Sequence, residues 1–87
     1  MKIYTDERVT LKFRVDNLNG DDFTVSDGDY SVYLDDAVVS AGKLNVADGC
    51  ELSFVFSVDT AGIYKIAIWY DVDTDRRKAE FPIEVVE

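Results

Sequence analysis

The sequence predicts an all-β protein, an antiparallel β-sandwich of about seven to eight short strands. Three observations predict it. Apolar and polar residues alternate along most of the chain, Asn, Asp and Gly separate the alternating segments, and no segment has the 3.6-residue period of a helix. Strands of this kind in 87 residues must form two sheets packed around one core.

The first half of the chain contains five segments that we expect to be strands. They are residues 9–15, 23–25, 30–34, 37–41 and 43–46. The first is the clearest, because Val9, Leu11, Phe13 and Val15 share one face while polar residues occupy the other. Residues rich in Asn, Asp and Gly predict the intervening turns, which are 17–22, 26–29, 35–36 and 47–49.

The second half contains three longer segments, residues 50–58, 64–72 and 79–85. In the middle segment one face carries Tyr64, Ile66, Ile68, Tyr70 and Val72, and the other carries Lys65, Ala67 and Trp69. The opposite reading, with Trp69 in the core and Tyr70 outside, fits the periodicity equally well. In the last segment we expect Ala79, Phe81, Ile83 and Val85 to face the core. Pro82 predicts an edge strand, or one paired on a single side there.

The stretch Asp59-Thr60-Ala61-Gly62-Ile63-Tyr64 is typical of a tyrosine corner, in which a Tyr hydroxyl reaches back to the main chain a few residues upstream. We expect Asp59, Gly62 and Tyr64 to build this corner. Ile66 stands two residues after the Tyr, where an antibody domain has a disulfide-forming Cys. The prediction is therefore an immunoglobulin-like sandwich without a disulfide. We expect one such domain over residues 9–87, preceded by an N-terminal arm or short edge strand over 1–8.

The charge excludes several classes of partner. The net charge is −9, from 18 acidic and 9 basic residues. Because phosphate binding needs clustered Lys and Arg, we expect no nucleic-acid partner, and anionic membrane surfaces are excluded by the same argument. No apolar run approaches the roughly 18 residues that span a bilayer. We also expect no signal peptide at the N-terminus, which lacks an apolar segment followed by a cleavage site.

The residue inventory argues against an enzyme. The chain has no histidine and one cysteine, Cys50, so the usual general base and a zinc site are missing. Cys50 begins an alternating segment, and we expect it to be a small buried hydrophobic residue. Two carboxylates suffice for glycoside hydrolysis, but that chemistry needs a deep pocket, which a sandwich of this size has little volume to form. We expect no catalysis and no cofactor.

Asp71-Val72-Asp73-Thr74-Asp75 is the sharpest local motif. Alternate aspartates can present oxygen ligands to Ca²⁺, which makes Asp71, Asp73 and Asp75 candidate ligands. An EF-hand would need Gly at the sixth position and Glu at the twelfth, where this chain has Arg76 and Pro82. The alternative is a charged hairpin between the last two strands, with the basic residues 76–78 balancing the aspartates.

Two aromatic residues, Tyr33 and Trp69, fall on the faces opposite the main apolar sets of their strands. Exposed Tyr and Trp can stack on sugar rings or anchor a protein interface. The alternative is that both faces of the sheet are partly covered, or that Trp69 extends the core. Tyr33 and Trp69 are therefore candidate interface residues.

The chain resembles the small Ig-like domains of tailed-bacteriophage virion proteins, such as the N-terminal domain of the baseplate upper protein and capsid-decoration proteins. The resemblance rests on the turn formed by Thr60, Ala61, Gly62 and Tyr64, a charged hairpin, and a last strand containing Phe81-Pro82. It implies a non-catalytic building block that docks on a larger capsid or tail protein and resides in the virion after assembly in the host cytoplasm. Formation of a homo-oligomer is left open.

Docking could use the N-terminal residues or an exposed strand edge, because an unpaired edge can recruit a strand from a partner. An alternative function is a module that binds glycans or a host surface through Trp69, Tyr33 and the acidic loops. A further alternative is an inhibitor that uses its acidity to mimic nucleic acid.

Overall fold

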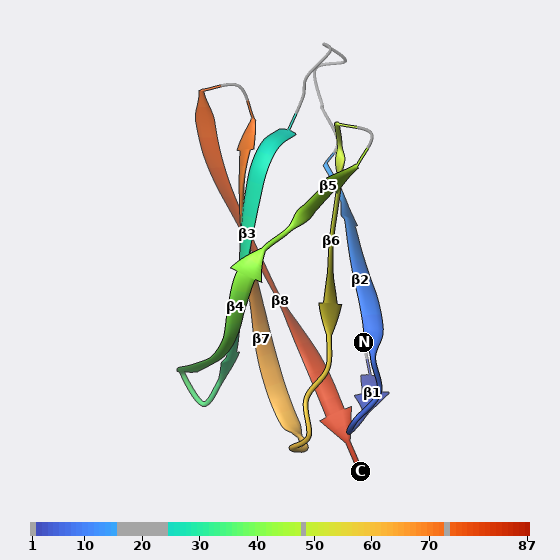
Figure 1. Cartoon of the computed structure of the whole chain (residues 1–87). Coiled ribbons are helices and arrows are strands. Elements are labelled where there is room, and N and C mark those ends of the chain that lie inside the picture. Colours follow the sequence, from blue (N-terminus) through green and yellow to red (C-terminus); the bar gives the residue numbers. More distant parts are fainter. Residues whose placement is uncertain (1, 16–24, 48, 73) are drawn as a thin grey trace.

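A computed structural model describes residues 2–15, 25–47, 49–72 and 74–87 of the protein (Figure 1). Its strands are β1 (Lys2–Tyr4), β2 (Val9–Arg14), β3 (Val25–Leu34), β4 (Ala37–Lys43), β5 (Asn45–Ala47), β6 (Glu51–Phe56), β7 (Gly62–Val72) and β8 (Asp75–Val86). The described part of the chain has no helix of the length and apolar character needed to cross a membrane.

The strands form two layers. One sheet has five strands in the order β1-β8-β7-β3-β4, and the other has three in the order β2-β6-β5. All pairs are antiparallel except β1 with β8, which are parallel. In immunoglobulin terms β2, β6 and β5 correspond to strands B, E and D, and β3, β7 and β8 to C, F and G. The predicted all-β, Ig-like sandwich without a disulfide is confirmed.

Apolar residues from both sheets fill the space between the layers. Leu52 and Ile66 have no exposed surface, and Ile66 occupies the position where a cystine would lie in an antibody domain. The rings of Tyr30 and Phe54 stack across the layers with centroids 4.0 Å apart. Tyr70 packs against this core, so the reading that placed Trp69 inside and Tyr70 outside is wrong.

The N-terminal residues belong to the folded domain. Residues 2–4 form the short edge strand β1, and the Ile3 side chain is only 6% exposed. The backbone beyond β1 is held as well, because Thr5 N–H donates to the Val86 carbonyl and Asp6 N–H to the Val58 carbonyl, each at 2.8 Å. Pro82 lies in β8 opposite Lys65 of β7, and β1 pairs with β8 only from Glu84 onward.

The predicted turn at residues 26–29 is wrong, because these residues lie inside β3. Gly28 is needed there for close packing: a Cβ at this position would lie 3.0 Å from Leu44 Cδ1 and 3.3 Å from the Trp69 carbonyl oxygen. A register irregularity between Val25 and Asp27 accommodates the polar stretch. Turn propensity is thus overridden by tertiary packing.

Three smaller predictions also need correction. Residues 43–46 are not one strand, because the chain changes sheets at Leu44, which is buried between β4 and β5. Cys50 is partly exposed, since it lies in the turn before β6 and not in the strand. Ala79 is exposed although Ile83 and Val85 of the same strand are buried. The predicted strand at 23–25 lies outside the described residues except for Val25, which begins β3.

Candidate interaction surfaces

The tyrosine corner is built as its sequence indicated. Tyr64 Oη donates a hydrogen bond to the Thr60 carbonyl oxygen at 2.6 Å, which ties the start of β7 to the β6–β7 connection. Asp59 Oδ1 accepts a hydrogen bond from Thr60 Oγ1 at 3.1 Å. A Cβ on Gly62 would lie 3.0 Å from Leu34 Cδ1, so β7 can approach β3 closely at this point. Burial raises the pKa of the Tyr64 hydroxyl, and the nearby Asp59 carboxylate adds to that rise.

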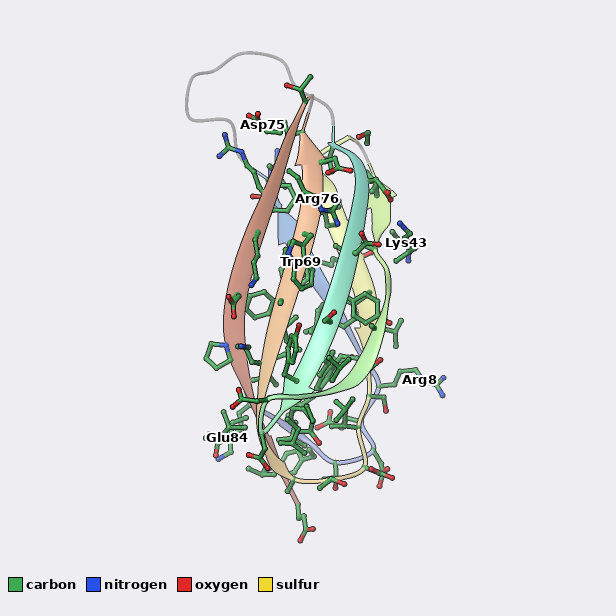
Figure 2. The ribbon with its side chains drawn as sticks, turned by 90° about the vertical axis from the view of Figure 1, so that its left-hand side faces the viewer. Arg8, Lys43, Trp69, Asp75, Arg76 and Glu84 are labelled. Carbon is green, nitrogen blue, oxygen red and sulfur yellow. The ribbon has the colours of Figure 1, made fainter. Side chains whose placement is uncertain are left out.

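Tyr33 and Trp69 lie on the outer face of the five-stranded sheet, the face turned toward the viewer in Figure 2. Each ring is covered by a lysine of the neighbouring strand. Lys65 Nζ lies 4.9 Å from the Tyr33 ring centroid, and Lys78 Nζ lies 5.2 Å from that of Trp69. The alternative of a partly covered outer face therefore describes these two aromatics.

Glu80 joins the two lysines. Its carboxylate lies 3.1 Å from Lys78 Nζ and 3.4 Å from Lys65 Nζ. Lys78 and then Lys65 hold the pKa of Glu80 below its ordinary value. Ala67 lies on the same outer face and is only 1% exposed.

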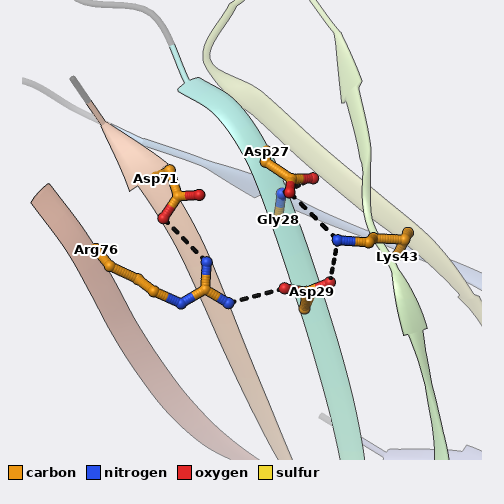
Figure 3. Close-up of polar contacts among 6 residues, drawn as sticks. All are labelled: Asp27, Gly28, Asp29, Lys43, Asp71 and Arg76. Atoms are coloured by element: carbon orange, nitrogen blue, oxygen red, sulfur yellow. Dashed lines mark hydrogen bonds and ion pairs between the residues drawn. The ribbon is translucent and has the colours of Figure 1, made fainter. Parts of the chain in front are cut away.

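A second ionic network lies on the same face (Figure 3). Arg76 donates to Asp71 at 2.9 Å and to Asp29 at 2.8 Å, and Lys43 Nζ contacts Asp29 at 2.9 Å and Asp27 at 3.2 Å. The network thus crosses β8, β7, β3 and β4. Lys43 and then Arg76 lower the pKa of Asp29, because both cations favour its charged form.

The outer face is consequently balanced in charge. Its two networks contain four basic residues, Lys43, Lys65, Arg76 and Lys78, and four acidic ones, Asp27, Asp29, Asp71 and Glu80. The formal net charge of −9 is therefore carried entirely by the rest of the chain. Exposed pairs of this kind contribute little to stability individually, because solvent screens them.

Two of the three candidate Ca²⁺ ligands at the β7–β8 hairpin, Asp71 and Asp75, lie next to arginine side chains. The Asp71 carboxylate is held by Arg76, and Asp75 lies 3.8 Å from Arg77. Asp73 lies outside the described residues. In the residues that the structure describes, no three His, Cys, Asp or Glu side chains are grouped to hold a metal ion. The contacts of Asp71 and Asp75 are those of the charged hairpin that the sequence offered as the alternative.

Strand β4 forms an edge whose exposure the sequence did not predict. All seven residues are exposed, including Val38 at 57% and Val39 at 48%. Residues 37–42 carry no charge, and Lys43 is the strand's one ionisable residue. β4 pairs with β3 on one side and is the last strand of its sheet in the described structure. A long, exposed and uncharged edge is a template for pairing with another chain.

A cleft of about 460 Å³ opens beside this edge. It lies between the end of the β3–β4 hairpin and the β6–β7 connection, and its lining is Asp6, Leu34, Val39, Ser40, Ser57, Val58, Asp59, Thr60 and Tyr64. The lining thus combines apolar residues with two aspartates and several residues that carry a hydroxyl group. Asp6 comes from the turn after β1, where its positive φ of 64° is a conformation that Asp tolerates better than most residues.

Sequence reasoning missed this region because its parts lie far apart in the chain. The edge comes from residues 37–43, whereas the cleft carboxylates come from residues 6 and 59. One signal was present: the uncharged run 37–42 is unusual in a chain where 31% of residues are charged.

No protein-family model matches the chain, and no curated protein matches it. Two solved structures share the fold. One is an engineered protein solved by the Northeast Structural Genomics Consortium, with a TM-score of 0.80 and 12% identity over 99% of this chain and 18% of that one. The other is described as a putative glycoside hydrolase from Bacteroides vulgatus, with a TM-score of 0.58 and 15% identity over 99% of this chain and 16% of that one. This chain therefore spans less than a fifth of either structure, and at these identities the likeness concerns the fold alone.

Proposed function

We propose that this chain is a non-catalytic structural protein that docks onto a larger protein. Following the resemblance in its sequence, we propose a tailed-phage virion, where it would decorate the capsid or belong to the tail or baseplate after assembly in the host cytoplasm. The observation that carries the proposal is the exposed, uncharged edge of β4 on a sandwich whose outer face is already closed by its own ion pairs. Such an edge suits assembly with another β-protein.

The test is co-sedimentation with virus particles. An epitope-tagged copy expressed in the source organism should migrate with intact particles on a density gradient and remain bound after nuclease treatment and a detergent wash. A matched copy carrying Leu52→Asp should be absent from the particle fraction, because it places a charge in the core and unfolds the domain. A wild-type protein that stays at the top of the gradient contradicts the virion proposal.

A second candidate function is binding of glycans or a host surface by the outer face. Trp69 and Tyr33 lie on this one face, and a module of the same fold forms part of a chain described as a putative glycoside hydrolase. A sugar would have to displace Lys78 from Trp69, at a cost of about 0.5–1 kcal/mol for an exposed cation–π pair. Glycan-array binding that is lost on Trp69→Ala and kept on Val55→Ala would support this function. An empty array would remove it.

A further inference from the structure

We propose that β4 and the adjacent cleft bind an extended basic segment of a partner protein, which adds to the five-stranded sheet as a further strand beside β4. The inference rests on the proposed function, since it names the docking edge and the chemistry of the partner.

The backbone of β4 offers unused pairing groups. Leu44 N–H donates to the Gly28 carbonyl of β3 at 2.8 Å. Successive residues of an antiparallel strand direct their backbone groups alternately to the two sides. The N–H and C=O groups of Ala41 and Lys43 therefore point away from β3, toward the edge where the described residues supply no neighbouring strand. A partner strand can accept and donate hydrogen bonds there.

The side chains next to the edge favour an apolar and basic partner. A strand added beside β4 places alternate side chains over the cleft, about 4.8 Å from β4. Val39 and Ser40 line the cleft together with Asp6 and Asp59, so a Lys or Arg facing inward comes close to two acidic residues and to apolar ones. The side chains facing outward continue the balanced outer face. The net charge of −9 steers a basic segment toward the protein.

A second copy of this chain suits the edge less well. Each copy carries a net charge of −9, and β4 contains a single cation, Lys43. Asp27 and Asp29 of the same copy already hold that lysine. A second β4 would therefore bring no free positive charge to the cleft.

The direct test uses the full ¹⁵N-labelled chain and two blocked seven-residue peptides. In one, Lys alternates with Thr and Val. In the other, Glu replaces every Lys. The Lys peptide should bind at least tenfold more tightly and shift the amide signals of Ala41 and Lys43, while the Trp69 indole signal stays in place. Equal binding of the two peptides, no binding of the Lys peptide at millimolar concentration, or shifts centred on Trp69 would overturn the inference.

Matched variants separate the edge from the cleft. Val39→Lys should abolish peptide binding, whereas Val55→Lys changes an equally exposed valine of β6 and should leave it unchanged. Asp6→Asn with Asp59→Asn should weaken binding of the Lys peptide at least fivefold, and Asn keeps the backbone conformation that Asp6 adopts. Unchanged affinity in the double Asn variant would contradict the basic character of the partner.

Sedimentation with particles tells the two proposals apart. Wild-type and Val39→Lys proteins that both co-sediment would overturn docking through β4 and leave the virion function standing. Loss of Val39→Lys alone supports both proposals. A wild-type protein that does not co-sediment contradicts the virion function, and the peptide experiment then decides the β4 inference by itself.

Discussion

At one end of the five-stranded sheet the edge formed by β8 carries charges and a proline, whereas at the other end β4 carries neither along residues 37–42 (Figure 1). β8 presents Arg76, Arg77, Lys78, Glu80 and Pro82 before β1 covers its final residues from Glu84 onward. Charges, proline and a covering strand are the usual means by which sheets avoid pairing with other chains.

The contrast indicates where the molecule is protected and where it is open. β8 has all three of these features, and β4 has none of the three until Lys43, although its register with β3 shifts once, between Val32 and Tyr33. Two exposed valines at a protected edge would be ordinary, but at an unprotected edge beside an acidic cleft they favour a binding role. This difference between the edges underlies both proposals above.

The largest loss of stability should come from weakening the packing of β1, the strand that pairs with the end of β8. Ile3→Ala should lower the free energy of unfolding by about 3 kcal/mol, because the Ile3 side chain is buried where β1 meets β8. Ile63→Ala is the matched control: this isoleucine is 71% exposed, and its loss should change stability by less than about 0.5 kcal/mol. Urea unfolding measures both. Equal stability of the two variants would mean that β1 does not belong to the cooperative unit.

The fold could be predicted from the sequence wherever one face of a strand is buried, because alternation then records burial directly. It did so for β2 and β6, and the Tyr64 corner could be placed from local residues alone. In β7 the consecutive residues Ile66, Ala67 and Ile68 are all buried, so alternation alone left the orientation of that strand open. It failed at residues 26–29, where the local turn signal was outweighed by Leu44 packing on Gly28 from 16 residues away. Local propensity cannot report a contact of that kind.

The candidate site was harder to predict for a related reason. An edge is defined by the absence of a neighbouring strand, and strand order is a property of the whole sheet. Val38 and Val39 are apolar residues that the sequence alone cannot separate from core valines such as Val32, which is only 1% exposed. The sequence offered Tyr33 and Trp69 as outer-face residues but left a core position for Trp69 open, and the lysines that cover both rings come from other strands.

The next largest loss of stability should come from removing the hydroxyl group of Tyr64, which lines the cleft beside β4. Tyr64→Phe should cost about 1 kcal/mol, the net value of the hydrogen bond to the Thr60 carbonyl. The folded-state pKa of Tyr64 is raised, so its contribution to stability is present below the ordinary value of 10 and is lost as the pH rises through the folded-state value. The Phe variant should therefore lose less stability than the wild type above pH 10. Tyr4→Phe, at a 58% exposed tyrosine, should behave like the wild type.

The contrast between the edges can also be reversed by design. Arg77→Thr with Pro82→Val removes a charge and the proline from β8, which should produce concentration-dependent association in light scattering. The stability of the folded chain should change by no more than about 0.5 kcal/mol, because both residues are exposed. Arg8→Thr removes the same charge from an exposed residue outside the strands and should leave the mass unchanged. Absence of association in the double variant would show that charge and proline are not what protects β8.

The smallest effect is expected on the outer face, where Glu80 links Lys65 and Lys78. Its pKa lies below the ordinary value, so its stabilising contribution is present above that value and is lost as the pH falls through the folded-state pKa. The difference in melting temperature between the wild type and Glu80→Gln should therefore be small at pH 7 and vanish in acid. Glu84→Gln, on the same strand and outside both networks, is the control.

Trp69 emission gives a second readout of the same titration, because protonating Glu80 releases Lys78 to move away from the indole. The emission of the wild type should then change across the acid range, while that of Glu80→Gln stays constant. If both proteins show the same acid transition, Glu80 does not hold Lys78 over the ring. A sugar would then have to displace only the cation–π contact of Lys78 with Trp69, and the balance between the two candidate functions would move toward glycan binding.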